Sequence, residues 1–80
     1  MLLEIIGKRI RDIRVVKENL NQDEFAKKVG LDRTYLSRLE SGKQNITIEN
    51  LNNICLKLGI TLKYFFEQFD YEINDDMEEN

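Results

Sequence analysis

Apolar residues recur along the chain with the three-to-four-residue spacing of an α-helix rather than the alternation of a β-strand. The first such stretch spans about residues 3–18. Its apolar face consists of Leu3, Ile6, Ile10, Ile13 and, at the far end, Val16. The opposite face is charged and consists of Lys8, Arg9, Arg11, Asp12 and Glu18. Gly7 lies inside the stretch and costs a helix about 1 kcal/mol relative to alanine, which suggests close packing there.

Two shorter helices are predicted next, from the residues that start and stop them. Asn21, followed three residues later by Glu24, forms the capping-box pattern that begins the second helix. Gly30 can take the left-handed conformation that ends it. Asp32 caps a third helix of about nine residues, which finishes at residues 41–42.

A fourth and a fifth helix complete the predicted fold. Residues 43–46 form a loop, after which Thr47 caps the fourth helix and Gly59 stops it. Its inner face consists of Leu51, Ile54, Cys55 and Leu58. Thr61 caps the fifth helix, which carries Leu62, Tyr64, Phe65, Phe66 and Phe69. The fold class is therefore all-α, with five short helices in a compact domain.

The net charge of −3 is unevenly distributed along the chain. Residues 70–80 contain six acidic residues and no Lys or Arg, which leaves residues 1–69 with a charge of +3. The chain thus divides into a mildly basic domain, residues 1–69, and an acidic tail, residues 70–80, whose composition predicts disorder. A mildly basic domain is compatible with DNA binding but does not by itself indicate it.

A chain of 80 residues lies near the lower size limit for a single hydrophobic core, so reinforcement is expected. Cys55 is the one cysteine and there is no histidine, which excludes an internal disulfide and a tetrahedral zinc site. Of the usual ways to reinforce so small a core, oligomerisation is the one left, and we expect it. There is no run of about 20 apolar residues that could span a membrane, so we expect a cytoplasmic protein. We also expect no metal or other cofactor. Cys55 itself is expected to be inert core packing.

The segment from Gln22 to Leu39 has the pattern of a helix-turn-helix unit, in which two helices are joined by a short turn. Ala26 is small, as the crossing point of the helices requires, and Gly30 lets the turn reverse direction. Five apolar residues lock both helices on a common core: Phe25, Val29, Leu31, Leu36 and Leu39. The alternative is an ordinary helical hairpin, but all of these positions together favour the DNA-binding unit.

The chain resembles the lambda-repressor-like (XRE-type) family of helix-turn-helix regulators. The resemblance is carried by residues 10–14 (IRDIR), 21–26 (NQDEFA), Gly30, 39–42 (LESG) and 58–60 (LGI). Residues 31–37 (LDRTYLS) and 45–47 (NIT) most resemble the controller proteins of restriction-modification systems. The resemblance implies a homodimeric transcription regulator that times expression of the endonuclease against the methyltransferase.

The chain departs from the family pattern between its first two helices. The spacing from Arg14 to Gln22 is one residue longer than usual, and Asn19 stands where the family places a glycine. Asparagine tolerates the left-handed conformation, so we expect the turn to form nevertheless.

The third helix is expected to lie in the major groove of DNA, with its N-terminal residues facing the base edges. Arg33 is the main candidate, because arginine pairs bidentately with guanine O6 and N7. Thr34, Tyr35, Ser37 and Arg38 complete the predicted base-reading set. For the two arginines, the alternative is a solvated helix face.

Contacts to the DNA backbone are expected from two further places. Gln22 begins the second helix, where free N–H groups favour a phosphate, and the resemblance implies that its side chain contacts the DNA backbone. The loop after the third helix is expected to reach phosphate or base with Lys43, Gln44 and Asn45. The resemblance also implies that Glu40, an acid at the end of the recognition helix, pairs with Arg14 as a structural strut.

The fifth helix carries more aromatic residues than five short helices are expected to bury. We expect them to form a two-fold homodimer interface with neighbouring apolar residues. The predicted interface consists of Ile60, Leu62, Tyr64, Phe65, Phe66 and Phe69. A symmetric dimer predicts a pseudo-palindromic DNA site. In the alternative, all four aromatic residues lie in the core of the monomer.

An enzyme is not expected, because the chain lacks histidine and a glycine-rich phosphate loop, and its one cysteine is expected to be buried. The remaining alternatives are an antitoxin that also binds its own operator and a phage-type repressor. An antitoxin needs a partner-binding segment, which residues 70–80 would have to supply. The same tail either contacts RNA polymerase, repels misplaced DNA or is simply a solvated end.

Overall fold

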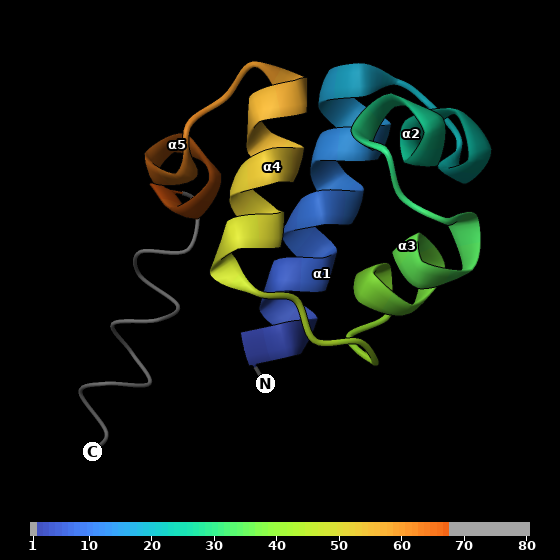
Figure 1. Ribbon diagram of the computed structural model, residues 1–80, viewed down its shortest axis with the longest axis horizontal. Helices are drawn as coiled ribbons and strands as arrows, with labels where there is room; N and C mark the ends of the chain where they lie inside the picture. Colours follow the sequence, from blue (N-terminus) through green and yellow to red (C-terminus); the bar gives the residue numbers. More distant parts are fainter. Residues whose placement is uncertain (1, 68–80) are drawn as a thin grey trace.

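The computed structural model describes residues 2–67, which form five α-helices, one π-helical segment and no β-strand (Figure 1). The elements are α1 (Leu2–Asp12), η1 (Ile13–Glu18), α2 (Gln22–Val29), α3 (Arg33–Glu40), α4 (Ile48–Leu58) and α5 (Leu62–Glu67). The predicted all-α fold is confirmed. Phe69 and the predicted tail, residues 70–80, lie outside the described residues.

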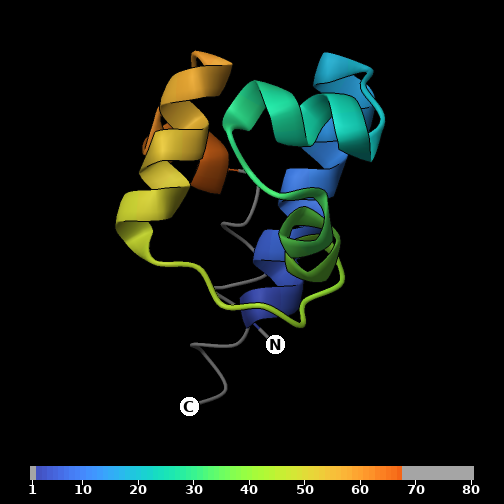
Figure 2. The same cartoon turned by 45° about the vertical axis from the view of Figure 1, so that its right-hand side comes forward.

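The helices enclose one hydrophobic core, to which every α-helix contributes. The core consists of Ile10, Ile13, Phe25, Ala26, Val29, Leu36, Leu39, Leu51, Ile54, Cys55, Leu58 and Phe65. Helix α3 lies across α1 and packs on α2, while α4 packs on α2 and carries α5 (Figures 1 and 2). The inward residues predicted for the second, third and fourth helices are buried here, with Leu31 partly buried against them. The helix-turn-helix pair is thus held by the core.

Helices α1 and α3 approach each other closely at Gly7. A Cβ atom at this position would lie 2.1 Å from the backbone oxygen of Leu39, which no real side chain tolerates. The two backbones therefore meet with no side chain between them, and the predicted close packing at Gly7 is confirmed.

The first helix ends in a π-helical turn that the apolar pattern did not predict. In the segment Ile13–Glu18 the chain makes wider turns, and the N–H of Asn19 donates to the carbonyl of Arg14. A π turn takes up one more residue than an α turn, which accommodates the longer spacing between Arg14 and Gln22. Asn19 has φ of 54° and ψ of 44°, so it supplies the left-handed conformation as expected.

Three residues of the first predicted helix, Val16, Arg9 and Glu18, differ from their predicted faces. Val16, predicted at the end of the apolar face, is 80% exposed, because the π turn changes the phase of the helix. Arg9, predicted on the solvated face, instead joins α1 to α5. Its guanidinium donates from Nε to the carbonyl of Phe65 (2.9 Å) and from Nη2 to that of Tyr64 (3.2 Å).

Glu18 links the π-helical segment to α2 rather than standing free on an outer face. Its carboxylate accepts hydrogen bonds from Lys28 and Lys17 and is 8% exposed. The hydrogen bond from Lys28 is the main cause that lowers the pKa of Glu18, while burial opposes this shift. The ion pair of Glu18 with Lys28 therefore joins the end of the first helix to α2 across the turn between them.

The predicted starts and stops of the helices are present. The side chain of Asn21 accepts from the N–H of Glu24, whose carboxylate accepts from the N–H of Asn21, which completes the capping box. Side-chain oxygens of Asp32, Thr47 and Thr61 accept from first-turn N–H groups. Left-handed glycines follow three helices: Gly30, Gly42 and Gly59. None of the helices in the described part is long and apolar enough to cross a membrane.

Candidate nucleic-acid interface

The recognition helix α3 has an inner half and an outer half. The inner half is packed in the core, where Leu36 and Leu39 are at most 1% exposed. The outer half is polar and exposed and consists of Arg33, Thr34, Ser37 and Arg38. The buried spacing of the leucines fixes which face of α3 turns to solvent, because residues three and four apart share one face of a helix.

The outer half of α3 lines an open hollow of about 290 Å³ on the surface. The lining residues are Gln22, Arg33, Thr34, Ser37 and Arg38. Four of the five predicted base-reading residues and one predicted backbone contact are thus gathered from two helices into one surface, referred to below as the reading face. Hydroxyls, an amide and two guanidiniums are the groups that hydrogen-bond to base edges and phosphates.

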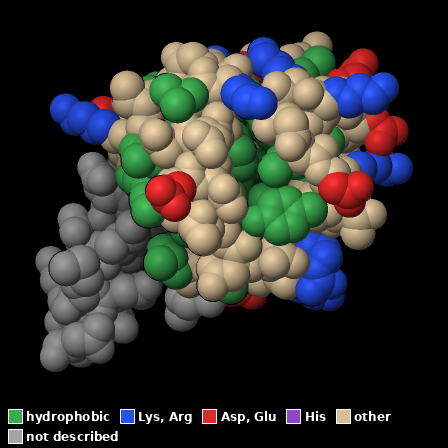
Figure 3. Space-filling view, viewed as in Figure 1, with side chains coloured by type: hydrophobic (Ala, Val, Ile, Leu, Met, Phe, Trp, Pro, Cys, Tyr) green, Lys and Arg blue, Asp and Glu red, His purple; other side chains and the backbone are tan. Residues whose placement is uncertain are grey.

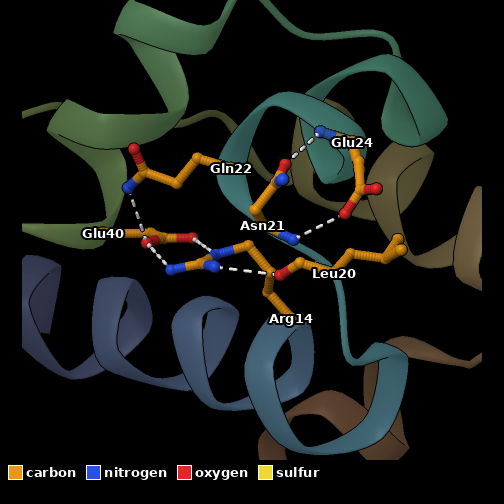
Figure 4. Close-up of polar contacts among 6 residues, drawn as sticks. All are labelled: Arg14, Leu20, Asn21, Gln22, Glu24 and Glu40. Carbon is orange, nitrogen blue, oxygen red and sulfur yellow. Dashed lines mark hydrogen bonds and ion pairs between the residues drawn. The ribbon is translucent and has the colours of Figure 1, made fainter.

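A nearly buried ion pair lies next to Gln22 of the reading face (Figure 4). Arg14 donates from Nε to Glu40 Oε2 at 2.7 Å and from Nη2 to Oε1 at 2.9 Å, and from Nη1 to the carbonyl of Leu20 at 3.0 Å. The side chains of Arg14 and Glu40 are only 11% and 4% exposed. The hydrogen bond from Arg14 to Glu40 raises the pKa of Arg14. The predicted pair is therefore present, and it joins the end of α3 to the first helix.

Gln22 is tied to this pair. Its Nε2 donates to Glu40 Oε1 at 3.0 Å, so one carboxylate oxygen receives both Gln22 and Arg14 (Figure 4). The first residue of α2 is thereby fixed to the last residue of α3. An amide held in this way stays at the edge of the reading face instead of sampling many rotamers.

Two of the predicted base readers hold the loop after α3. Arg38 donates from Nε to Gln44 Oε1 at 3.2 Å and from Nη2 to the carbonyl of Lys43 at 3.1 Å. The hydroxyl of Tyr35 donates to the carbonyl of Asn45 at 3.2 Å. Tyr35 and Arg38 thus shape the loop, which leaves the side chains of Lys43 and Asn45 exposed.

Asp23 on α2 forms an ion pair with Arg33 of the reading face and was missed by the sequence interpretation. Its Oδ1 lies 3.4 Å from Nε of Arg33, and the two side chains are 63% and 62% exposed. The sequence signal that could have indicated Asp23 is its place directly after Gln22, because Gln22 was expected to contact DNA. The sequence also offers Asp32 beside Arg33, and the crossing of α2 and α3 decides that Asp23 faces the guanidinium.

Charge on the molecule is mixed rather than strongly basic. On the face shown in Figure 3, Lys and Arg side chains gather mainly on the side where α2 and α3 lie, with Asp and Glu between them. Among residues 2–67, no three His, Cys, Asp or Glu side chains are grouped so as to hold a metal ion. Cys55 is fully buried, and burial raises the pKa of its thiol.

The predicted dimer interface needs one correction. Phe65 is 1% exposed within the single chain, where its ring packs in the core and lies edge-on to Phe66. It is therefore a core residue and not a surface residue. Tyr64 is 40% exposed, and Ile60, Leu62 and Phe66 are partly buried at the edge of the core. Phe69 lies outside the described residues.

The helix-turn-helix family model matches residues 10–65, so the chain belongs to the helix-turn-helix family and is a DNA-binding regulator. The control protein C.MunI of Mycoplasma sp is 41% identical over 66 residues, which cover 82% of this chain and 89% of C.MunI. The control protein C.BamHI of Bacillus amyloliquefaciens is 36% identical over 59 residues, 74% of this chain and 73% of C.BamHI. These relatives are regulatory proteins and not enzymes.

A solved structure extends this similarity to three dimensions. The restriction-modification controller protein C.Esp1396I, crystallised as a tetramer with its natural 35 base-pair operator, superposes with a TM-score of 0.79 at 36% identity. The match covers 91% of this chain and 95% of that protein. The predicted resemblance to restriction-modification controller proteins is confirmed.

Proposed function

We propose that this protein is the controller protein of a restriction-modification system. It acts in the cytoplasm as a homodimeric transcription regulator, binds a pseudo-palindromic operator and controls its own gene and that of the endonuclease. The observation that carries the proposal is the reading face, in which two helices of a helix-turn-helix pair join guanidiniums, hydroxyls and an amide on one exposed surface.

The residues of the reading face divide into base contacts and backbone contacts. Arg33 stands on the first turn of α3 and reads a guanine through a bidentate pair, with Thr34 and Ser37 beside it on the exposed face. Gln22 and Lys43 contact phosphates, which positions the helix without selecting a sequence. Their places at the edge of the hollow and on the exposed loop support this division.

Tyr35 and Arg38 serve the interface in a second way. Because both hold the loop of residues 43–45 through hydrogen bonds, they determine where Lys43 and Asn45 meet the DNA. The hydroxyl oxygen of Tyr35 can still accept a hydrogen bond from a base. These two residues therefore combine a structural role with the predicted contact.

The homodimer is supported by the apolar surface next to α5. Ile60, Leu62, Tyr64 and Phe66 retain exposed area at the edge of a small core. A two-fold contact there covers this area and places two copies of α3 on successive half-sites of one operator. C.Esp1396I assembles as a tetramer on its operator, which agrees with pairing. A contact between the acidic residues 70–80 and RNA polymerase belongs to the same proposal.

DNA binding is tested with a duplex from the region upstream of the protein's own gene. Gel shifts compare the wild type with Arg33→Ala and Lys43→Ala, on duplexes with both half-sites or with one half-site altered. Arg33→Ala is expected to cost about 1–3 kcal/mol and to relax the sequence preference at one base position. Lys43→Ala is expected to weaken binding to all sequences and to reduce the salt slope by about 1.

The absence of any salt-sensitive, sequence-dependent shift by the wild type would refute the proposal. Equal loss of binding with Arg33→Ala on every sequence would refute the assigned role of Arg33. A methyltransferase gene and an endonuclease gene beside the coding sequence agree with restriction-modification control, whereas a toxin gene there contradicts it.

A further inference from the structure

We propose that Asp23, which pairs with Arg33 of the reading face, is a specificity-determining residue, because its carboxylate orients Arg33 toward a guanine. The inference rests on the proposed role of Arg33 in base readout. Asp23 Oδ1 lies 3.4 Å from Nε of Arg33, across the crossing of α2 and α3. At this separation the two groups form an ion pair and not a hydrogen bond. The carboxylate attracts the guanidinium to its side, and Nη1 and Nη2 remain for a bidentate pair with guanine O6 and N7.

Arg33 occupies a place that the helix itself does not favour for a cation. It is the first residue of α3, at the end where the helix dipole repels positive charge, and the first turn of α3 contains no acid. The carboxylate of Asp32 is engaged with the N–H groups of Thr34 and Tyr35. Asp32 thus caps the helix, and the carboxylate that pairs with the Arg33 guanidinium is that of Asp23 on the neighbouring helix.

Asp23 weakens binding to DNA of any sequence, which suggests that its role is to make binding depend on the base sequence. The carboxylate lies 3.4 Å from Nε of Arg33, a proposed base contact, so its negative charge stands near bound DNA and repels the phosphates. Binding to any duplex is weaker for that reason. The carboxylate limits the positions that the Arg33 guanidinium can adopt. Without it, the guanidinium could bind a phosphate, which is present on every sequence.

The pair is weak in the free protein and becomes stronger on the operator. Both side chains are more than 60% exposed, so water and salt screen their attraction before DNA binds. A duplex that covers the reading face removes that water, and the attraction between the two charges rises in the drier contact. The effect of Asp23 is therefore expected in base preference and not in the stability of the free protein.

The test compares Asp23→Asn with Asp12→Asn, which removes the same charge from an exposed pair with Lys8, a pair that does not include Arg33. Dissociation constants are measured at one salt concentration. The duplexes are the upstream operator, a set carrying each base at each half-site position, and an unrelated sequence. Asp23→Asn is expected to lower the preference for guanine about fivefold at the position read by Arg33, within the range of one bidentate contact.

Two further results belong to the same experiment. Asp23→Asn is expected to bind the unrelated duplex about twofold more tightly, because a charge that repels phosphate is gone. In the Arg33→Ala background the same substitution is expected to leave base preference unchanged. Asp12→Asn is expected to alter the preference at no position, and circular dichroism checks that all variants are folded.

The outcomes separate this inference from the proposed function. If the wild type shows no operator preference, the proposed function fails. If Arg33→Ala abolishes a preference that Asp23→Asn keeps within twofold, the orienting role of Asp23 is wrong. A loss of preference spread evenly over all half-site positions also overturns it, because a carboxylate that orients one arginine acts at one base pair.

Discussion

The inner and outer halves of α3 are held by different kinds of contact. On the inner side, Leu36 and Leu39 are buried in the core and Glu40 is bound by Arg14 and Gln22. On the outer side, Arg33 is held by an exposed ion pair with Asp23, and Ser37 faces the open hollow. One short helix therefore carries a rigidly fixed side and an adaptable side.

This difference separates stability from recognition. Core leucines and a nearly buried ion pair have large effects on the free energy of unfolding, because removing them leaves cavities or unpaired charge. Exposed side chains have small effects on unfolding and remain available for DNA. Substitutions on the two sides of α3 should therefore give two distinct patterns, which the variants below test from the largest expected effect to the smallest.

The largest effect is expected for Glu40→Ala. The substitution leaves the charged Arg14 nearly buried without its carboxylate and should lower the free energy of unfolding by about 3–5 kcal/mol. Urea unfolding measures this. The control is Asp12→Ala, which breaks the exposed Lys8–Asp12 pair and should cost less than about 1 kcal/mol. Similar losses in the two variants would show that the nearly buried Arg14–Glu40 pair stabilises the fold no more than an exposed pair does.

A smaller loss is expected for Gly7→Ala. The new methyl group would meet the Leu39 carbonyl at 2.1 Å and push α3 away from α1, at a cost of about 1–3 kcal/mol after a helix-propensity gain of about 1 kcal/mol. Thermal unfolding measures the change. Lys8→Ala, at an exposed neighbouring position, should stay within about 0.5 kcal/mol of the wild type. A more stable Gly7→Ala variant would contradict the backbone contact.

The smallest effect is expected for Lys28→Ala, because Lys28 is 44% exposed and Lys17 keeps its hydrogen bond to the largely buried Glu18. Its loss should cost about 0.2–1 kcal/mol at neutral pH. Because Lys28 lowers the pKa of Glu18, the contribution is present above the unfolded pKa of about 4.3 and disappears as pH falls through the lower folded value. Urea unfolding at neutral and acidic pH, with Lys27→Ala as control, should show a difference between the variants only at neutral pH.

The helix-turn-helix region could be predicted from the sequence because its signals are local. Asn21 with Glu24, Asp32 before α3 and glycines after the helices act within one helical turn, and each forms the expected contact. The spacing of Leu36 and Leu39 also determined the buried side of α3 and, by elimination, the reading face. The Arg14–Glu40 pair came from the family resemblance and not from spacing.

The remaining features depend on contacts between distant parts of the chain. Phe65 and Tyr64 are adjacent aromatic residues, and only the packing of α5 on α4 decides that the first is buried and the second exposed. The helical period places Arg9 on a charged face, whereas the packing of α5 brings the carbonyls of Phe65 and Tyr64 within hydrogen-bond distance of its guanidinium. The pairing of Asp23 with Arg33 likewise requires the crossing of two helices.

Cys55 has a practical consequence for chemical labelling. It is the one cysteine of the chain, it is fully enclosed, and its thiol resists deprotonation. A maleimide dye or spin label therefore reacts slowly with the native protein, since the thiolate is the reactive form and must first become accessible. A cysteine introduced on an exposed helix can be modified selectively while Cys55 stays in place, so probes of operator geometry require no prior removal of a core residue.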